Sequence, residues 1–171
     1  MTSDFLAKFS DSSHWDAEDL FYSDCEALGN FSLPTVAKSI FKSGLPSWVA
    51  PNIFLYAPVL SSESVAIFGE DRNEREIMIV APSGAIIANK NGKTIYVASG
   101  LDVFIKHLIL YADMVESALK IKGKRAVVDN NIPDECISAF ESIVRSDEID
   151  VVDGDTFWAE EIRRLRSHII D

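Results

Sequence analysis

The apolar positions between residues 76 and 122 predict three short strands that lead into one long helix. The apolar runs cover 77–81, 85–89 and 94–98, and they are separated by Pro82-Ser83-Gly84 and Asn91-Gly92. Proline fixes φ and glycine permits positive φ, so both separators are turn signals, and Asn-Gly is typical of a type I′ hairpin. This order predicts an antiparallel meander.

The segment after the meander has the spacing of an amphipathic helix. From Leu101 to Leu119 apolar residues recur in steps of three and four, with acids and lysines on the other side. We therefore expect one face of this helix to pack on the sheet. Ser99 and Asp102 are placed to cap its first turn as a variant of the capping box, and Gly123 to end it in a left-handed conformation.

The remaining pattern completes an α+β fold. Runs 53–56 and 65–69 predict two further strands, and the polar residues 70–75 predict an exposed loop before the meander. Further helices are predicted at 3–9, from Ser12 or Ser13 through Phe21, after a Ser32 cap, after Pro133 and after Thr156. We expect the later helix and loop residues Ile137, Phe140, Ile143, Val144, Ile149, Val151 and Val152 to point into the core. The predicted fold is a central antiparallel or mixed sheet of at least five strands, flanked by helices.

The length and composition favour one globular domain over residues 1–171, with residues 1–30 as an acidic N-terminal arm. The chain has no run of eighteen apolar residues, and Asp4 and Lys8 break the pattern of a signal peptide. These features predict a cytoplasmic protein without a membrane segment. Cys25 and Cys136 are far apart and lack a partner motif, so buried thiols are expected.

The formal net charge of −11 is concentrated at the two ends of the chain. Residues 1–34 hold seven acids and one lysine, and residues 134–171 hold eleven acids and four arginines. The middle of the chain is slightly basic, with eleven bases and nine acids. An acidic surface repels nucleic acids and anionic lipids and attracts basic proteins, so we expect a basic protein partner.

Catalytic and cofactor signals are weak throughout the sequence. The three histidines have no metal-ligand spacing, and a surface or packing role is favoured over general-base chemistry for His107. No glycine-rich phosphate loop or nucleophile elbow occurs, and the lysines near residue 122 fit a helix C-terminus. We therefore expect no enzyme activity, cofactor, metal or nucleic acid. A hydrolase that uses a pair of carboxylates from the acidic loop, residues 147–155, is an alternative.

Two surfaces are candidates for binding a partner. The first is an acidic patch that forms if the two chain ends lie close together, as termini often do. The second combines Trp48, which is either a packed aromatic or an interface residue, with the loop 70–75. The candidate residues are Asp16, Glu18, Asp19, Asp147, Glu148, Asp150 and Asp153 for the first surface, and Trp48, Asp71 and Glu74 for the second.

Four short motifs occur in an order that resembles the SUKH superfamily of bacterial immunity proteins, especially its fourth family. Leu33-Pro34 precedes a predicted helix that ends in Gly44-Leu45-Pro46, and Ser83-Gly84 lies at a strand-turn-strand centre. The segment 97–101 leads into a long helix with an early Phe104, and an acidic segment, 153–158, ends in a tryptophan. Residues 1–30 match nothing in that family.

The resemblance implies a SUKH-like immunity domain that neutralises a cognate polymorphic toxin by direct binding, without catalysis. Because nuclease toxins tend to be basic, the acidity of this chain favours a nuclease. We expect aromatic anchors inside an acidic rim, with about 1,200–2,000 Å² of total buried surface that occludes the toxin's active face. The alternative is a regulatory or scaffolding module of the same fold that binds a cellular protein.

Overall fold

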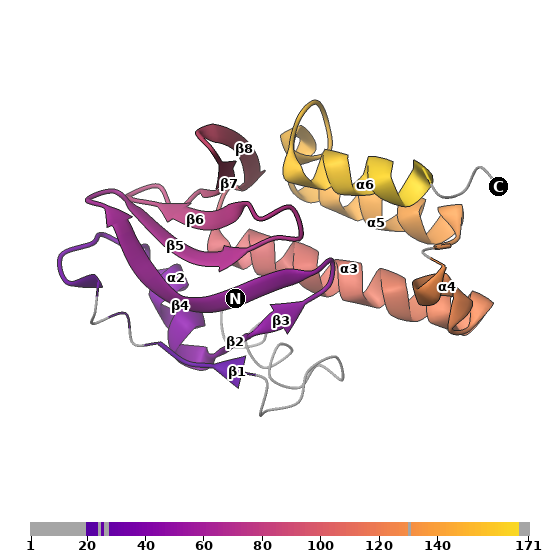
Figure 1. Ribbon diagram of the computed structural model, residues 1–171, viewed down its shortest axis with the longest axis horizontal. Helices are drawn as coiled ribbons and strands as arrows, with labels where there is room; N and C mark the ends of the chain where they lie inside the picture. Colours follow the sequence, from indigo (N-terminus) through magenta and orange to yellow (C-terminus); the bar gives the residue numbers. More distant parts are fainter. Residues whose placement is uncertain (1–19, 24, 26–27, 130, 168–171) are drawn as a thin grey trace.

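The computed structural model describes residues 20–23, 25, 28–129 and 131–167, and it has an α+β fold. Its centre is a six-stranded antiparallel sheet in the order β3-β4-β5-β6-β7-β8. In Figure 1, α2 and α3 lie behind the sheet, while α5 and α6 lie beside it. The predicted fold class is therefore confirmed, with six strands in the main sheet of the described residues.

The strands are β1 Leu20–Phe21, β2 Leu45–Pro46, β3 Trp48–Val49, β4 Ile53–Ser62, β5 Val65–Glu70, β6 Glu76–Val80, β7 Ile86–Lys90 and β8 Lys93–Ala98. The helices are α2 Thr35–Ser43, α3 Leu101–Lys122, α4 Arg125–Val128, α5 Asp134–Asp147, η3 Ile149–Val151 and α6 Phe157–Ser167. Among the described residues, no helix is long and apolar enough to cross a membrane.

The predicted meander and its long helix are confirmed. Strands β6, β7 and β8 pair in sequence, and Asn91 and Gly92 both have positive φ, as a type I′ turn requires. Helix α3 ends at Gly123, whose φ is +63°. The match follows from local signals, because each turn lies between two strands that are adjacent in the chain.

The inner face of the sheet forms the main core with α2 and α3. Phe68 of β5 contacts Phe41 of α2 and Phe104 of α3 in edge-to-face pairs, with ring centroids 5.6 and 6.2 Å apart. All three rings are completely buried. Edge-to-face aromatic pairs add about 0.5–1.5 kcal/mol beyond the burial of their area.

A second aromatic cluster joins α3, α5 and α6. Trp158 is completely buried and packs against His107, Tyr111 and Phe140, with ring centroids 5.6, 6.4 and 5.6 Å away. The expected packing role of His107 is therefore confirmed. Both cysteines are buried, also as expected.

Several predicted local features differ in the structure. Gly100 and Pro34 are the N-caps of α3 and α2, and neither helix has a side-chain cap, so the roles predicted for Ser99 with Asp102 and for Ser32 are wrong. The Ser99 N–H instead donates to Glu148, 49 residues away. Ile143 and Ile149 are exposed rather than buried, and Leu20–Phe21 form a strand rather than the end of a helix. Thr156 does cap α6, by accepting from the Ala159 N–H.

Candidate functional site

The outer face of the main sheet is not covered by any described helix. Along β4, Ile53 and Leu55 are buried on the inner face, so Phe54 and Tyr56 point outward. The strand register places Trp48 opposite Phe54 and Phe54 opposite Glu70, so these side chains lie in one row across the face. Glu76 of β6 pairs with Glu70 and continues the row.

A second row crosses the same face from β4 to β8. It consists of Val59, Ile67, Met78, Ile87 and Tyr96, each paired with the next. All five side chains are apolar or aromatic, although the outer face of an antiparallel sheet is usually polar when it meets water. We call the two rows, together with Tyr56, the outer sheet face.

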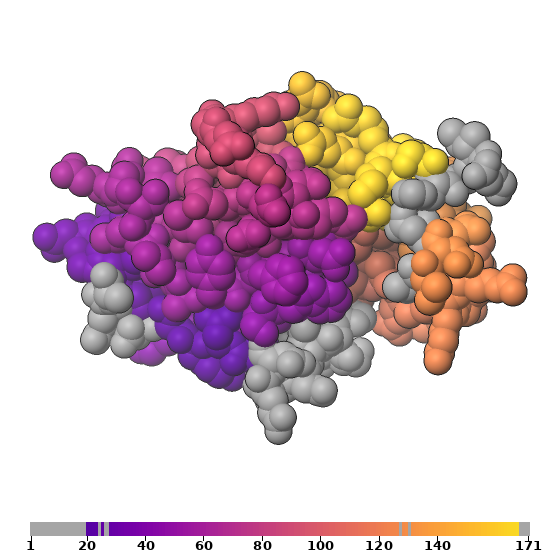
Figure 2. All heavy atoms as spheres, viewed as in Figure 1, coloured from indigo at the N-terminus to yellow at the C-terminus, as the bar shows by residue number. Residues whose placement is uncertain are grey.

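Several large apolar side chains of the outer sheet face are open to solvent. The exposed fractions are 48% for Trp48, 54% for Phe54, 39% for Tyr56 and 60% for Val59. Figure 1 shows no helix in front of β4–β6, and Figure 2, drawn in the same view, presents this side of the sheet to the viewer. Clustered exposed apolar residues with charged neighbours are typical of protein-binding surfaces.

Gly69 allows the close packing that positions Tyr56 on this face. A Cβ atom at Gly69 would lie 2.7 Å from the Phe54 carbonyl oxygen and 2.8 Å from a Leu55 methyl carbon. The Tyr56 hydroxyl donates to the Gly69 carbonyl at 3.3 Å. Burial, followed by the charges of Glu70 and Glu76, raises the pKa of Tyr56, so its hydroxyl stays protonated at neutral pH.

At the β8 edge the outer sheet face borders part of the predicted acidic patch. Tyr96, Glu148, Ile149, Asp150 and Thr156 line a hollow of about 610 Å³. Burial and the charges of Glu148 and Asp150 raise the pKa of Tyr96. Trp48 and these two acids, which were assigned to separate predicted surfaces, therefore lie toward opposite edges of one sheet.

Three residues of the predicted acidic patch form ion pairs or hydrogen bonds within the protein. Asp147 pairs with Lys106 at 2.6 Å, and Asp153 accepts from Arg145 at 3.0 and 3.1 Å. Glu148 also accepts from the Ser99 N–H at 2.9 Å. The patch residues Asp16, Glu18 and Asp19 lie outside the described residues.

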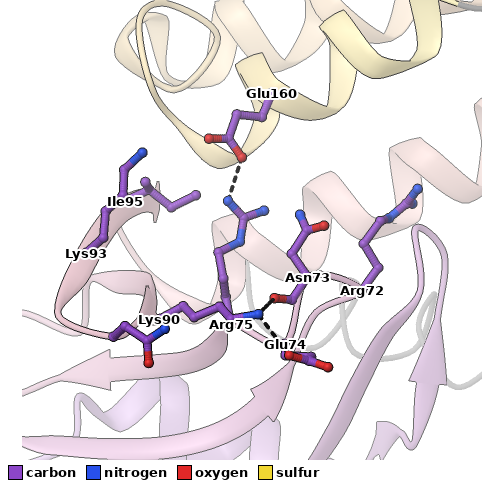
Figure 3. Close-up of a pocket in the computed structure, with 9 residues that line it drawn as sticks. Arg72, Asn73, Glu74, Arg75, Lys90, Lys93, Ile95 and Glu160 are labelled. Carbon is purple, nitrogen blue, oxygen red and sulfur yellow. Dashed lines mark hydrogen bonds and ion pairs between the residues drawn. The ribbon is translucent and has the colours of Figure 1, made fainter.

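The loop 70–75 is only partly an exposed tip, and for Asp71 that prediction is wrong. Asp71 is 4% exposed and accepts from the N–H groups of Asn73 and Arg75 and from the Arg75 side chain at 2.6 Å. Arg75 also pairs with Glu160 of α6, the contact drawn in Figure 3. Asp71 therefore holds the loop rather than offering its charge to a partner. Glu74, in contrast, has a 77% exposed side chain.

A polar hollow of about 600 Å³ lies beside this loop, and Figure 3 shows its side chains. It contains four cationic side chains, but three of them already contact carboxylates. Lys90 pairs with Glu74, Arg75 with Glu160, and Arg72 with Glu161. Because an anion would have to displace these partners, the hollow is a weaker candidate than the outer sheet face.

Phe54, Tyr56, Glu70 and Glu76 were missed as site residues by sequence reasoning. The segment 53–60 is apolar at nearly every position, whereas a strand with one face in water should alternate with polar residues. That lack of alternation was the available signal. Within the described residues, no group of three metal-ligating side chains occurs.

Comparisons with family models, curated proteins and solved structures give no match for this chain. The resemblance to the SUKH superfamily therefore rests on the sequence motifs alone.

Proposed function

We propose that this chain is an immunity protein that binds a cognate toxin through the outer sheet face. The observation that carries the proposal is the exposure of three aromatic side chains, Trp48, Phe54 and Tyr56, on a sheet face that no described element covers. Tryptophan and tyrosine are the residue types most often found as binding hot spots. The toxin and its activity come from the motif resemblance and are part of the proposal.

The expected mechanism is steric occlusion of the toxin's active face. The aromatic side chains would be the anchors, with Glu70 and Glu76 beside them in the same row and Glu148 and Asp150 at the β8 edge. Aromatic anchors beside polar residues are typical of a standard interface, which buries about 800 Å² on each partner. A basic toxin domain suits these acidic neighbours.

The proposal can be tested by co-expressing the protein with a candidate toxin encoded beside its gene. The Trp48→Ala/Phe54→Ala variant should fail to protect cells, and each substitution should weaken binding by about 2 kcal/mol or more, as loss of a hot-spot aromatic does. The matched control is Ile121→Ala, which removes a 55% exposed apolar side chain at the end of α3.

The denaturation midpoint of each variant must first be shown to be unchanged within error, because a misfolded variant also fails to protect. If the folded double variant protects and binds as well as the parent, the outer sheet face is not the toxin site. The alternative, a regulatory or scaffolding module, predicts binding to a cellular protein and no protection against any neighbouring toxin.

A further inference from the structure

Glu70 and Glu76 form an unusual pair on the outer sheet face. They are direct partners in the β5–β6 register, so their Cβ atoms lie about 4.5–5.5 Å apart. Like charges placed directly opposite each other destabilise a sheet. Both residues are exposed, and no cation among the described residues forms an ion pair with either carboxylate.

Aromatic side chains border the pair on one side. Phe54 lies next to Glu70 in the same row and Trp48 lies next to Phe54, while the Tyr56 hydroxyl is held at the Gly69 carbonyl. The row therefore passes from two exposed rings to two exposed carboxylates over four neighbouring strands. The ligand that satisfies both halves must carry a positive charge and a flat surface.

We propose that the Glu70–Glu76 pair, with the ring of Phe54, receives an arginine side chain of the partner protein. This inference rests on the proposed function and names the chemistry of its partner. A guanidinium group is planar, presents five N–H donors to carboxylates, and stacks on aromatic rings. A lysine ammonium satisfies the carboxylates as a point charge but lacks the flat surface that stacks on Phe54.

Charge also selects this partner over a second copy of the chain. A face-to-face dimer through the outer sheet face would bring two copies with a net charge of −11 together, each adding Glu70 and Glu76 to the contact. Like charges brought together across an interface cost several kcal/mol, so self-association is opposed. A basic segment instead removes the repulsion between the two carboxylates.

The test uses two short probes, acetyl-Gly-Arg-Gly-amide and acetyl-Gly-Lys-Gly-amide, titrated into the ¹⁵N-labelled protein at low salt. The arginine probe should produce saturable shifts centred on the amides of Phe54, Tyr56, Glu70 and Glu76. The lysine probe should bind more weakly at the same place. The Glu70→Gln/Glu76→Gln variant should lower the affinity for the arginine probe about 10-fold or more, as loss of a charge pair does.

The matched control is Asp129→Asn/Glu135→Gln, which removes the same charge from exposed positions outside the sheet and should leave the shifts unchanged. The proposal is overturned if the arginine probe causes no localised shifts or if it binds the Glu70→Gln/Glu76→Gln variant within twofold of the parent. It is also overturned if the control variant weakens binding of the arginine probe equally. The proposed function is tested separately, by measuring toxin binding of the Trp48→Ala/Phe54→Ala variant. It fails if that variant binds the toxin as tightly as the parent. If the aromatic substitutions abolish toxin binding but the arginine probe does not bind, the outer sheet face is the toxin site and the arginine site is absent.

Discussion

Two tryptophans of this protein have opposite environments. Trp158 is completely buried among rings from three helices, whereas nearly half of Trp48 is open to solvent. Trp158→Ala should therefore destabilise the fold by about 3–5 kcal/mol, the usual cost of removing a large core aromatic. Trp48→Ala is the matched control and should change the free energy of unfolding far less. Chemical denaturation measures both, and equal midpoints for the two variants would contradict the assignment.

His107 should make the stability of the fold depend on pH. It is completely buried, and this burial lowers its pKa from 6.5 to about 4, with Asp147 opposing the shift and Lys106 adding to it. Below pH 6.5 the imidazole of His107 therefore binds a proton in the unfolded chain, whereas in the folded chain it binds one only near pH 4. The contribution of neutral His107 to the free energy of unfolding is complete above pH 6.5. It is lost as the pH falls toward 4, by up to about 3 kcal/mol.

The test is to measure the free energy of unfolding of the parent and of His107→Leu between pH 7.5 and pH 4, a range that spans the lowered pKa of His107. The comparison separates the contribution of His107 from that of the carboxylates. Asp147, whose carboxylate lies 3.7 Å from the His107 Nε2 atom, remains in both proteins. The stability of the variant should fall less steeply with decreasing pH. Parallel curves would show that His107 does not titrate differently in the folded and unfolded states.

At the scale of elements, the loop 70–75 connects the sheet to α6. Asp71 accepts two backbone hydrogen bonds and holds Arg75, and Arg75 in turn pairs with Glu160. Asp71→Ala should cost about 3–5 kcal/mol, because it removes one of the two carboxylates that hold a largely buried arginine and leaves two backbone N–H groups without their acceptor. Glu74→Ala, in the same loop but on an exposed pair with Lys90, should cost no more than about 1 kcal/mol. A similar thermal shift in both variants would be the contrary result.

The same loop shows where sequence reasoning stopped. Strands β6 to β8 and helix α3 were predictable because their turns and periodicity are local. The mixed charge of residues 70–75 also fits an exposed tip. The sequence does not show that Glu160, 85 residues further on, lies next to Arg75 in the fold. The cap predicted at Ser99 is wrong for the same reason, because the Ser99 N–H donates to the distant Glu148.

The outer sheet face was only half predictable. Trp48 was singled out because tryptophan is common at interfaces, but its neighbours Phe54 and Glu70 come from register, which depends on the bulges in β4 and β5. One shifted residue would turn Phe54 and Tyr56 inward. The row that joins two rings to two acids therefore becomes visible only when the strands are assembled.

For the molecule as a whole, charge should govern how fast the proposed toxin partner binds. A net charge of −11 attracts a basic partner over distances at which contacts play no part. The association rate with a basic toxin should fall steeply as salt rises from about 0.01 to 0.15 M, while the dissociation rate changes less. Stopped-flow measurements would reveal this, and an association rate that does not vary with salt would leave charge no role in steering.

An open apolar face also sets the colloidal behaviour of the free protein. When no partner covers this face, the exposed side chains of Trp48, Phe54 and Val59 favour self-association. At neutral pH, repulsion between molecules that each carry a net charge of −11 opposes it. Near pH 4.6, where the net charge vanishes, that repulsion is lost and the parent should precipitate. The Trp48→Ser/Phe54→Ser variant should stay in solution at higher concentration there, and light scattering of both proteins during the same pH titration would decide. The solubility of the free protein would then depend on pH, with a minimum where its net charge is zero.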